Sequence, residues 1–312
     1  MIQPNKKPGI KPVKLKEIAV KVTEPSQLMN FLVAKFPEKS RTTIKSLLAH
    51  KQVSVDDMMT TQFDFPLKRG QTVFINKKKT DEKPRFRDLR IVHEDADLIV
   101  IDKASGLLSM ASETEKQKTA YSMLSEYVKR SNPKNLIFIV HRLDRETSGL
   151  MMFAKSKKIQ ETLQKDWNDA IIERSYIAVV EGSMEKTEGT VTSWLKENKA
   201  MMMYSSQTPD DGQKAVTHYK VLKTNKQFSL LEVKLETGRK NQIRVHMKDL
   251  GFPVTGDKKY GAKLNPVGQM GLHARVLAFK HPVTNRPMRF DTPIPIKFQK
   301  LFRMSVRTSD TE

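Results

Sequence analysis

The residues best suited to chemistry lie near the middle of the chain. Two apolar stretches, 137–140 and 149–154, flank a polar loop in which Asp144 stands between Arg142 and Arg145. A loop that joins two strands of a rigid scaffold is a common carrier of reactive groups. A carboxylate in this position can act on a substrate, or it can pair with either arginine and steady a turn. The spacing alone leaves both interpretations open.

The composition indicates a polyanionic partner. The 312 residues include 56 Lys+Arg and 35 Asp+Glu, a formal net charge of +21 with a pI near 9.9. Such an excess opposes folding through self-repulsion unless a polyanion neutralises it, and each nucleic-acid phosphate that is contacted releases counterions. The excess is spread along the chain, which favours a binding surface over a basic tail.

Other features exclude several kinds of protein. The chain has no cysteine, which rules out disulfides, thiolate catalysis and cysteine-ligated zinc. The first residues lack the apolar core of a signal peptide, and no apolar run approaches the roughly 18 residues needed to cross a bilayer. We therefore expect a soluble, cytoplasmic protein with no membrane partner. We also expect a monomer.

The hydrophobic pattern predicts a small module before the reactive loop. Apolar residues spaced by three and four occur within 28–32 and again within 44–48, which predicts two helices, and Ser40 is placed to cap the second. Alternating residues 53–55 and 72–75 predict short strands. Arg41 and Lys45, one helical turn apart, can grip a phosphate backbone or form an ordinary solvated face.

These residues resemble an RNA-binding module known as the S-four domain, from Leu28-Met29-Asn30-Phe31-Leu32 through Ser40-Arg41-Thr42-Thr43-Ile44-Lys45 to Lys68-Arg69-Gly70-Gln71-Thr72-Val73. The resemblance implies that the second helix, with Arg41 and Lys45, meets RNA. The predicted organisation is therefore a basic N-terminal arm (1–22), the module (23–76), a charged linker (77–90), a catalytic domain (91–305) and a tail (306–312).

The reactive loop itself resembles a known signature. His141-Arg142-Leu143-Asp144-x-x-Thr147-Ser148-Gly149 is similar to the signature loop of RluA-type pseudouridine synthases. Three further blocks follow in the family's order: Arg174-Ser175-Tyr176 through Gly182, Thr237-Gly238-Arg239-Lys240-Asn241-Gln242-Ile243-Arg244, and Gly271-Leu272-His273-Ala274. One departure is Asn241, where the family usually has histidine. Asparagine still donates and accepts hydrogen bonds, but it does not titrate near neutral pH.

The resemblance implies an isomerisation of uridine in structured RNA and assigns the residues that perform it. Arg142 fills the space left by the flipped base, and Asp144 attacks the ribose or helps to remove a proton from it. Burial favours the protonated form of a carboxylate, so Arg244 is implied as the cation that keeps Asp144 ionised. Tyr176 is implied to stack on the uracil.

Leu272 and Ile243 are expected to form the apolar wall of the pocket, although ordinary core packing explains them equally well. The same alternative, a plain strand aromatic, applies to Tyr176 without the resemblance. The implied fold class is α+β, with the small N-terminal α/β module followed by a catalytic domain whose mixed, mainly antiparallel central sheet is flanked by helices. RNA is expected in a basic cleft between the two.

No cofactor and no metal are expected. The reaction oxidises and hydrolyses nothing, and residues 256–264 depart from a phosphate-binding loop in their spacing and in having Leu264 where a hydroxyl is required. His141, His246 and His273 lack the short spacing of zinc ligands, so we expect them to be structural.

Two other functions remain open. A hydrolase of the glycosidic bond normally uses a second carboxylate, for which Glu146 is the nearest candidate. A noncatalytic RNA-binding ribosome-assembly factor fits the basic charge equally well. For the enzyme, the N-terminal module favours large-subunit ribosomal RNA as substrate, with transfer RNA as the alternative.

Overall fold

The chain folds into two compact units, Met1–Lys83 and Pro84–Glu312. The computed structural model describes residues 17–49, 52–56, 58–76, 86–111, 115, 118–165 and 167–302. Most of the predicted basic arm, residues 77–85 of the predicted linker and the predicted tail lie outside the described residues.

The first unit packs two helices on a small antiparallel sheet with strand order β1-β6-β3-β4. The helices expected from the apolar spacing are present, and Ser40 Oγ accepts the Thr43 backbone N–H at 3.1 Å to cap the second. Leu28 and Leu32 of the first helix and Ile44 of the second are buried in the core of this unit. The elements are β1 (Glu17–Lys21), β2 (Ser26–Gln27), α1 (Leu28–Lys35), α2 (Arg41–Ala49), β3 (Val53–Val55), β4 (Met58–Met59), β5 (Pro66–Leu67) and β6 (Thr72–Asn76).

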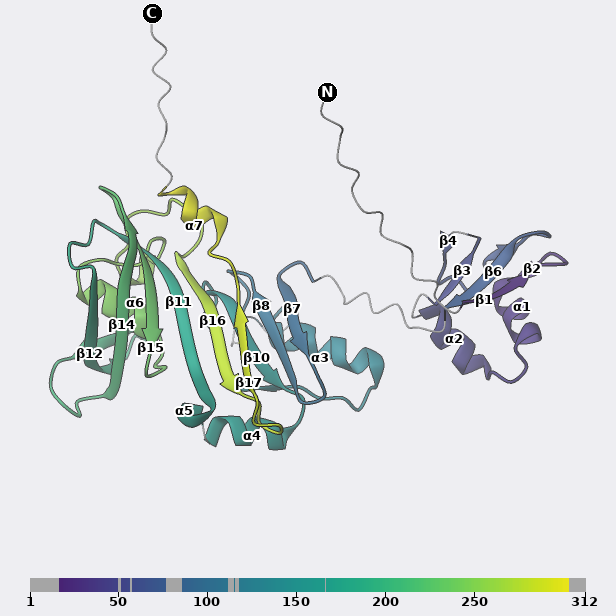
Figure 1. Cartoon of the computed structure of the whole chain (residues 1–312), viewed down its shortest axis with the longest axis horizontal. Helices are drawn as coiled ribbons and strands as arrows, with labels where there is room; N and C mark the ends of the chain where they lie inside the picture. Colours follow the sequence, from purple (N-terminus) through teal and green to yellow (C-terminus); the bar gives the residue numbers. More distant parts are fainter. Residues whose placement is uncertain are drawn as a thin grey trace, which may run out of the picture. The chain divides into compact units, whose positions relative to one another are not determined.

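The second unit is built on one large sheet with strand order β13-β12-β14-β15-β11-β16-β10-β8-β7, and β17 and β9 pair with β16 and β10. Figure 1 shows the sheet from β12 across to β7. Its strands are β7 (Leu89–Glu94), β8 (Leu98–Lys103), β9 (Phe138–Ile139), β10 (Ser148–Ala154), β11 (Ile171–Glu181), β12 (Glu188–Glu197), β13 (Met203–Ser206), β14 (Gln213–Thr224), β15 (Phe228–Leu235), β16 (Leu272–Lys280) and β17 (Pro287–Asp291). Its helices are α3 (Ala120–Ser131), α4 (Lys157–Lys165), α5 (Trp167–Ala170), α6 (Gln242–Asp249) and α7 (Ile296–Lys300), with a 3₁₀ turn at Lys258–Tyr260.

The sheet is antiparallel at every pairing between the described strands except that of β10 with β16. The α+β class with a mixed, mainly antiparallel sheet is thus confirmed. The apolar stretch 137–140 was expected to form one of the two strands that flank the reactive loop. Within it, only the two residues of β9 pair with β10.

Helices cover both faces of this sheet. Alternate residues of β8 and β10 pack with α3 on one face and with α4 on the other, because side chains along a strand alternate between the two faces. In the same way, alternate residues of β11 pack with α6 or with α7. Tyr176 belongs to both the α3 cluster and the α6 cluster, so these two helices share a face. The site described next lies between them.

Candidate active site

A pocket of about 210 Å³ opens on the face that α3 and α6 share. Typical ligand pockets hold roughly 300–1,000 Å³, so this one suits a single base better than a large ligand. It is lined by Arg142, Leu143, Asp144, Thr147, Tyr176, Leu235, Gly238, Arg239, Lys240, Asn241, Gln242, Ile243, Arg244 and Leu272. The three further blocks of the resemblance and the reactive loop therefore each supply residues to one pocket.

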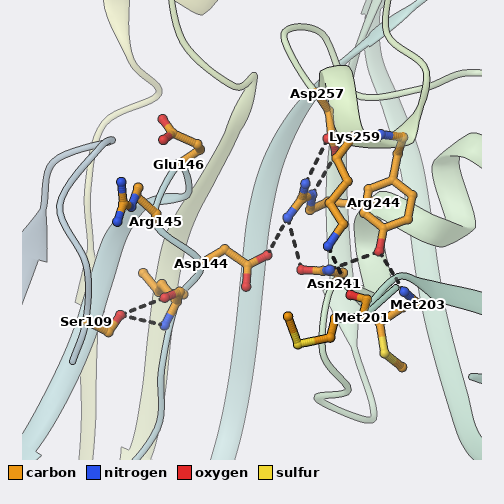
Figure 2. Close-up of polar contacts among 12 residues, drawn as sticks. Ser109, Asp144, Arg145, Glu146, Met201, Met203, Asn241, Arg244, Asp257 and Lys259 are labelled. Atoms are coloured by element: carbon orange, nitrogen blue, oxygen red, sulfur yellow. Dashed lines mark hydrogen bonds and ion pairs between the residues drawn. The ribbon is translucent and has the colours of Figure 1, made fainter. Parts of the chain in front are cut away.

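The carboxylate of Asp144 points across the pocket to the guanidinium of Arg244 (Figure 2). Arg244 Nη1 donates to Asp144 Oδ2 at 3.0 Å, although 100 residues separate the two in sequence. The Asp144 side chain is 26% exposed and therefore accessible from the pocket, whereas Arg244 is 12% exposed. Asp144 thus pairs with Arg244 and forms no ion pair with its sequence neighbours Arg142 and Arg145.

A second carboxylate fixes the other edge of the same guanidinium. Arg244 Nε donates to Asp257 Oδ2 at 2.6 Å, and Nη2 donates to Asp257 Oδ1 at 2.8 Å. Such a two-pronged pair restricts the arginine to one orientation. Burial acts to lower the pKa of Arg244, but the hydrogen bonds and charges of Asp257 and Asp144 outweigh it and raise that pKa above its ordinary value. The cation facing Asp144 is permanent.

Asn241 completes the hydrogen bonding of Arg244. Its Oδ1 accepts from Arg244 Nη1 at 3.0 Å, and its Nδ2 donates to the Tyr260 hydroxyl at 2.9 Å. The central carbon of the Arg244 guanidinium lies 4.8 Å from the centre of the Tyr260 ring. The Tyr260 hydroxyl accepts a hydrogen bond from the Met203 N–H at 3.2 Å. Asn241 has φ of 55°, a left-handed conformation that asparagine, aspartate and histidine adopt more readily than other side chains. An amide here therefore orients the arginine without titrating.

The loop that carries Asp144 is held by the segment that follows β8. Ser109 Oγ donates to the Leu143 carbonyl at 2.6 Å and accepts the Leu143 N–H at 3.1 Å (Figure 2). Lys103 is fully buried, and its Nζ donates to the carbonyls of Ala104, Leu107 and Arg145 at 3.1, 2.7 and 3.0 Å. Burial lowers the pKa of Lys103 to about 8. The residues on both sides of Asp144 are thus fixed.

The other residues expected at the site reach the pocket from separate elements. Tyr176 comes from β11, Leu272 from β16 and Ile243 from α6, and Arg142 is exposed at its edge. Leu272 and Ile243 are each 4% exposed and also pack in the α6 cluster, so they are both core and pocket wall. Burial raises the pKa of the Tyr176 phenol, which stays protonated at neutral pH.

Comparison with known proteins decides the identity. A family model described as RNA pseudouridylate synthase matches residues 97–249. The chain is 34% identical to an uncharacterised RNA pseudouridine synthase of Bacillus subtilis, YlyB, over 85% of this chain and 89% of that one. The chain belongs to the RNA pseudouridine synthase family. The expected resemblance of the reactive loop to RluA-type pseudouridine synthases is confirmed, and the chain is an isomerase that acts on uridine in RNA.

Two further relatives agree with this assignment. One is the ribosomal large subunit pseudouridine synthase D of Buchnera aphidicola, 31% identical over 94% of this chain and 99% of that one. The other is the solved structure of human RNA pseudouridylate synthase domain containing 4, which covers 67% of this chain and 90% of that one with a TM-score of 0.56 at 25% identity.

The histidines of this pseudouridine synthase that we expected to be structural are engaged in hydrogen bonds. His246 contacts Ser193 Oγ at 2.9 Å and Thr217 Oγ1 at 2.8 Å, and His273 contacts Ser148 Oγ and Thr292 Oγ1, each at 2.8 Å. These hydroxyl groups occupy both nitrogens of each ring. Burial lowers the pKa of His246 to about 4 and also lowers that of His273. His141 Nε2 accepts the Met152 N–H at 3.1 Å.

One group of potential metal ligands lies outside the pocket. The ligand atoms of Asp95, Asp97 and His281 lie within 4.8 Å of one another. However, His281 Nδ1 accepts the N–H groups of Val283 and Thr284, each at 3.2 Å. A ring whose Nδ1 accepts hydrogen bonds carries a proton on Nε2, which faces Asp95 Oδ2 at 3.4 Å and is therefore not a free metal ligand. We interpret the group as a hydrogen-bonded turn.

Sequence reasoning did not identify Asp257, Tyr260, Ser109 or Lys103. Asp257 and Tyr260 stand in the segment that was compared only with a phosphate-binding loop, and the Gly256-Asp257 pair carried no other signal. Lys103 did carry one, because it ends the apolar strand β8 at a position where a buried residue is expected. Arg41 and Lys45 are exposed on α2 of the first unit.

The sequence has no apolar run long enough to cross a bilayer, and the length and apolar character of the helices bear on the same question. Within the residues that the structure describes, no helix is both long enough and apolar enough to span a bilayer.

Proposed function

We propose that this enzyme converts specific uridines of large-subunit ribosomal RNA to pseudouridine, with Asp144, Tyr176 and Arg244 as its catalytic residues. The observation that carries the proposal is the 3.0 Å contact between Arg244 and a partly exposed Asp144 in a pocket the size of one base. A carboxylate that is paired with a cation and still accessible can reach a substrate in the pocket.

The reaction breaks the bond between ribose C1′ and uracil N1 and forms a bond between C1′ and C5. N1 gains a proton, and the proton on C5 is lost to solvent, so no cofactor is consumed. The uridine must leave its helix to reach the pocket. Arg142, exposed at the edge, takes the place of the flipped base, since a planar guanidinium stacks on bases.

Tyr176 then stacks on the uracil, a contact worth about 1–3 kcal/mol, with Leu272 and Ile243 as the apolar wall. Asp144 attacks the ribose or assists removal of a ribose proton. Because the Tyr176 pKa is raised, its phenol can donate a proton or a hydrogen bond but does not act as a base at neutral pH.

Hydrolysis of the glycosidic bond is disfavoured, because the acids nearest to Asp144 are either paired and buried or lie outside the pocket. Asp257 binds Arg244 through both oxygens and its side chain is 1% exposed. Glu146 Oε2 faces Ser105 Oγ at 3.4 Å and does not line the pocket. Neither acid is available to activate a water molecule beside Asp144. Hydrolysis demands release of free uracil from RNA, and we expect none.

The first unit is proposed to act as an S-four-like RNA-binding module. Exposed Arg41 and Lys45 on α2 suit contacts to phosphates. This module, and the name of the Buchnera relative, support large-subunit ribosomal RNA over transfer RNA. We further propose that the enzyme works as a monomer in the cytoplasm.

Pseudouridine mapping across total RNA tests this proposal. A strain that lacks the protein is compared with the same strain complemented by wild type, by Asp144→Asn or by Arg41→Ala/Lys45→Ala. We expect one or a few large-subunit positions to lose pseudouridine, to recover it with wild type and to stay unmodified with Asp144→Asn. The double variant should restore it only in part. Loss confined to transfer RNA contradicts the substrate, and full restoration by Asp144→Asn contradicts the site.

A further inference from the structure

Arg174 is a cation beside the pocket for which the fold provides no counterion. It lies in β11 two residues before Tyr176 and is partly buried, and its Nε atom is buried with no hydrogen-bond partner. Among the residues that the structure describes, none forms an ion pair with it. A polar atom shielded in this way costs free energy unless a partner arrives.

Arg244, in the same region, has a hydrogen-bond partner for each of its three nitrogens. Its side chain is 12% exposed, and these nitrogens donate to Asp257, Asp144 and Asn241. The pKa of Arg244 is raised as a result, whereas burial lowers the pKa of Arg174. A carboxylate near Arg174 would have reversed that direction. Within the part of the chain that the structure describes, the charge of Arg174 therefore has no carboxylate partner.

Two contacts hold the Arg174 guanidinium in place. Its central carbon lies 5.6 Å from the centre of the Trp167 ring, and a cation–π contact of this kind fixes the plane of the group. Its Nη1 fills the space beside Gly238, where a Cβ atom would lie only 2.5 Å away. Gly238 lines the pocket, so this guanidinium packs directly against a pocket-lining residue, although Arg174 itself is not one of them. The side chain is thus oriented before any ligand binds.

An anion is the partner that suits Arg174 best, because a guanidinium is a permanent cation with five N–H donors. The substrate is a polyanion, and the pocket edge already carries Arg142, Arg239 and Lys240. A planar guanidinium matches the geometry of a phosphate and can donate to it twice. A flipped nucleotide brings its own flanking phosphates to the pocket edge.

We propose that Arg174 binds a backbone phosphate next to the flipped uridine, and that residue 238 is glycine because any side chain there would displace this arginine. The inference rests on the function proposed above and adds an RNA-binding residue to it. Arg174 contributes to substrate affinity and not to the chemical step.

The test measures tritium release from total RNA labelled at uridine C5, prepared from a strain that lacks the protein, with KM followed from 50 to 200 mM salt. Arg174→Met keeps the packing on Trp167 but removes the charge. We expect KM to rise roughly tenfold with kcat nearly unchanged, and the slope of log KM against log salt to fall by about 0.7–0.9, the value of one phosphate contact. Arg174→Lys should keep the slope and show a smaller rise in KM.

Gly238→Ala tests the same contact from the other side. Its backbone is not in the left-handed region, and the clash is with the flexible end of a side chain, so the variant should fold. We expect a rise in KM, and no further rise when Gly238→Ala is added to Arg174→Met. If the two effects add in full, Gly238 does not act through Arg174.

Two controls separate the outcomes. Arg286→Met removes an exposed arginine from the turn between β16 and β17, away from the pocket-lining residues, and should leave KM and its salt slope unchanged. Asp144→Asn should abolish release, and if it does not, the proposed site fails independently of Arg174. Unchanged KM and slope in Arg174→Met, or a loss confined to kcat, would overturn the inference.

Discussion

At the scale of single residues, the account depends on the pairing of Asp144 with Arg244. The sequence predicted both residues, but only through the family resemblance, since nothing in the local pattern brings together positions 100 residues apart. The resemblance did not predict why Arg244 stays in place. Arg244 is held in place by Asp257 and Asn241. The spacing of apolar residues does not identify a buried acid that orients another side chain.

Replacing Asp257 tests this orientation. Asp257→Asn removes half of a buried two-pronged pair, and we expect it to lower the free energy of unfolding by about 3 kcal/mol. Because Arg244 can then turn away from Asp144, kcat should fall about 100-fold. Urea unfolding and tritium release measure the two effects. Asp291→Asn, which breaks a more exposed pair with Arg275, should cost no more than about 1 kcal/mol and leave kcat intact.

Asn241 offers a second test with a matched pair of variants. Asn241→Ala loses both the acceptor for Arg244 and the donor to Tyr260, and we expect kcat to fall about tenfold. Asn241→His tolerates the left-handed backbone and has one ring nitrogen for each partner, so it should stay close to wild type. Equal kcat in the alanine variant would show that the amide is not a positioning group.

At the scale of elements, the site depends on the parallel contact between β10 and β16 at the end of the reactive loop. The sequence predicted β10 from its apolar run, but it did not predict this pairing. Gly149 makes it possible, because its φ is 111° and a Cβ would lie 2.2 Å from the Ala274 carbonyl oxygen. The position of Gly149 at the end of the signature does not by itself indicate which strand packs against it.

Two glycine variants separate strain from collision. Both Gly149 and Gly251 have positive φ, but nothing lies within 4 Å of a Cβ at Gly251. Gly251→Ala should cost about 1 kcal/mol of backbone strain, whereas Gly149→Ala adds a clash with backbone and should cost several kcal/mol. Thermal unfolding compares them. Similar losses in both variants would contradict the close approach of β10 to β16.

At the scale of the whole molecule, composition predicted a polyanionic partner such as nucleic acid, and the family resemblance implied RNA and the fold class. The acid response of the protein depends instead on a few buried groups. His246 and His273 are neutral in the folded state, with the pKa of His246 near 4 and that of His273 also lowered. Their ordinary pKa, about 6.5, applies in the unfolded chain.

The sign of the pH effect follows from this difference. Between about pH 6.5 and 4 the unfolded chain binds more protons at His246 than the folded chain does. The contribution of His246 to stability is therefore complete above pH 6.5 and is lost as the pH falls, by up to about 1.4 kcal/mol per pH unit, and His273 acts in the same direction. Urea unfolding followed by the fluorescence of Trp167 and Trp194, both in the second unit, measures it. His246→Gln should flatten the slope over this range. An unchanged slope would mean that His246 is not buried as a neutral ring.

The most direct test of the central claim is tritium release from RNA labelled at uridine C5, measured together with RNA binding for wild type and Asp144→Asn. The account predicts that wild type releases tritium without free uracil, and that the variant binds RNA with similar affinity but releases only background. Equal release by the two proteins would contradict the assignment of the reaction to Asp144.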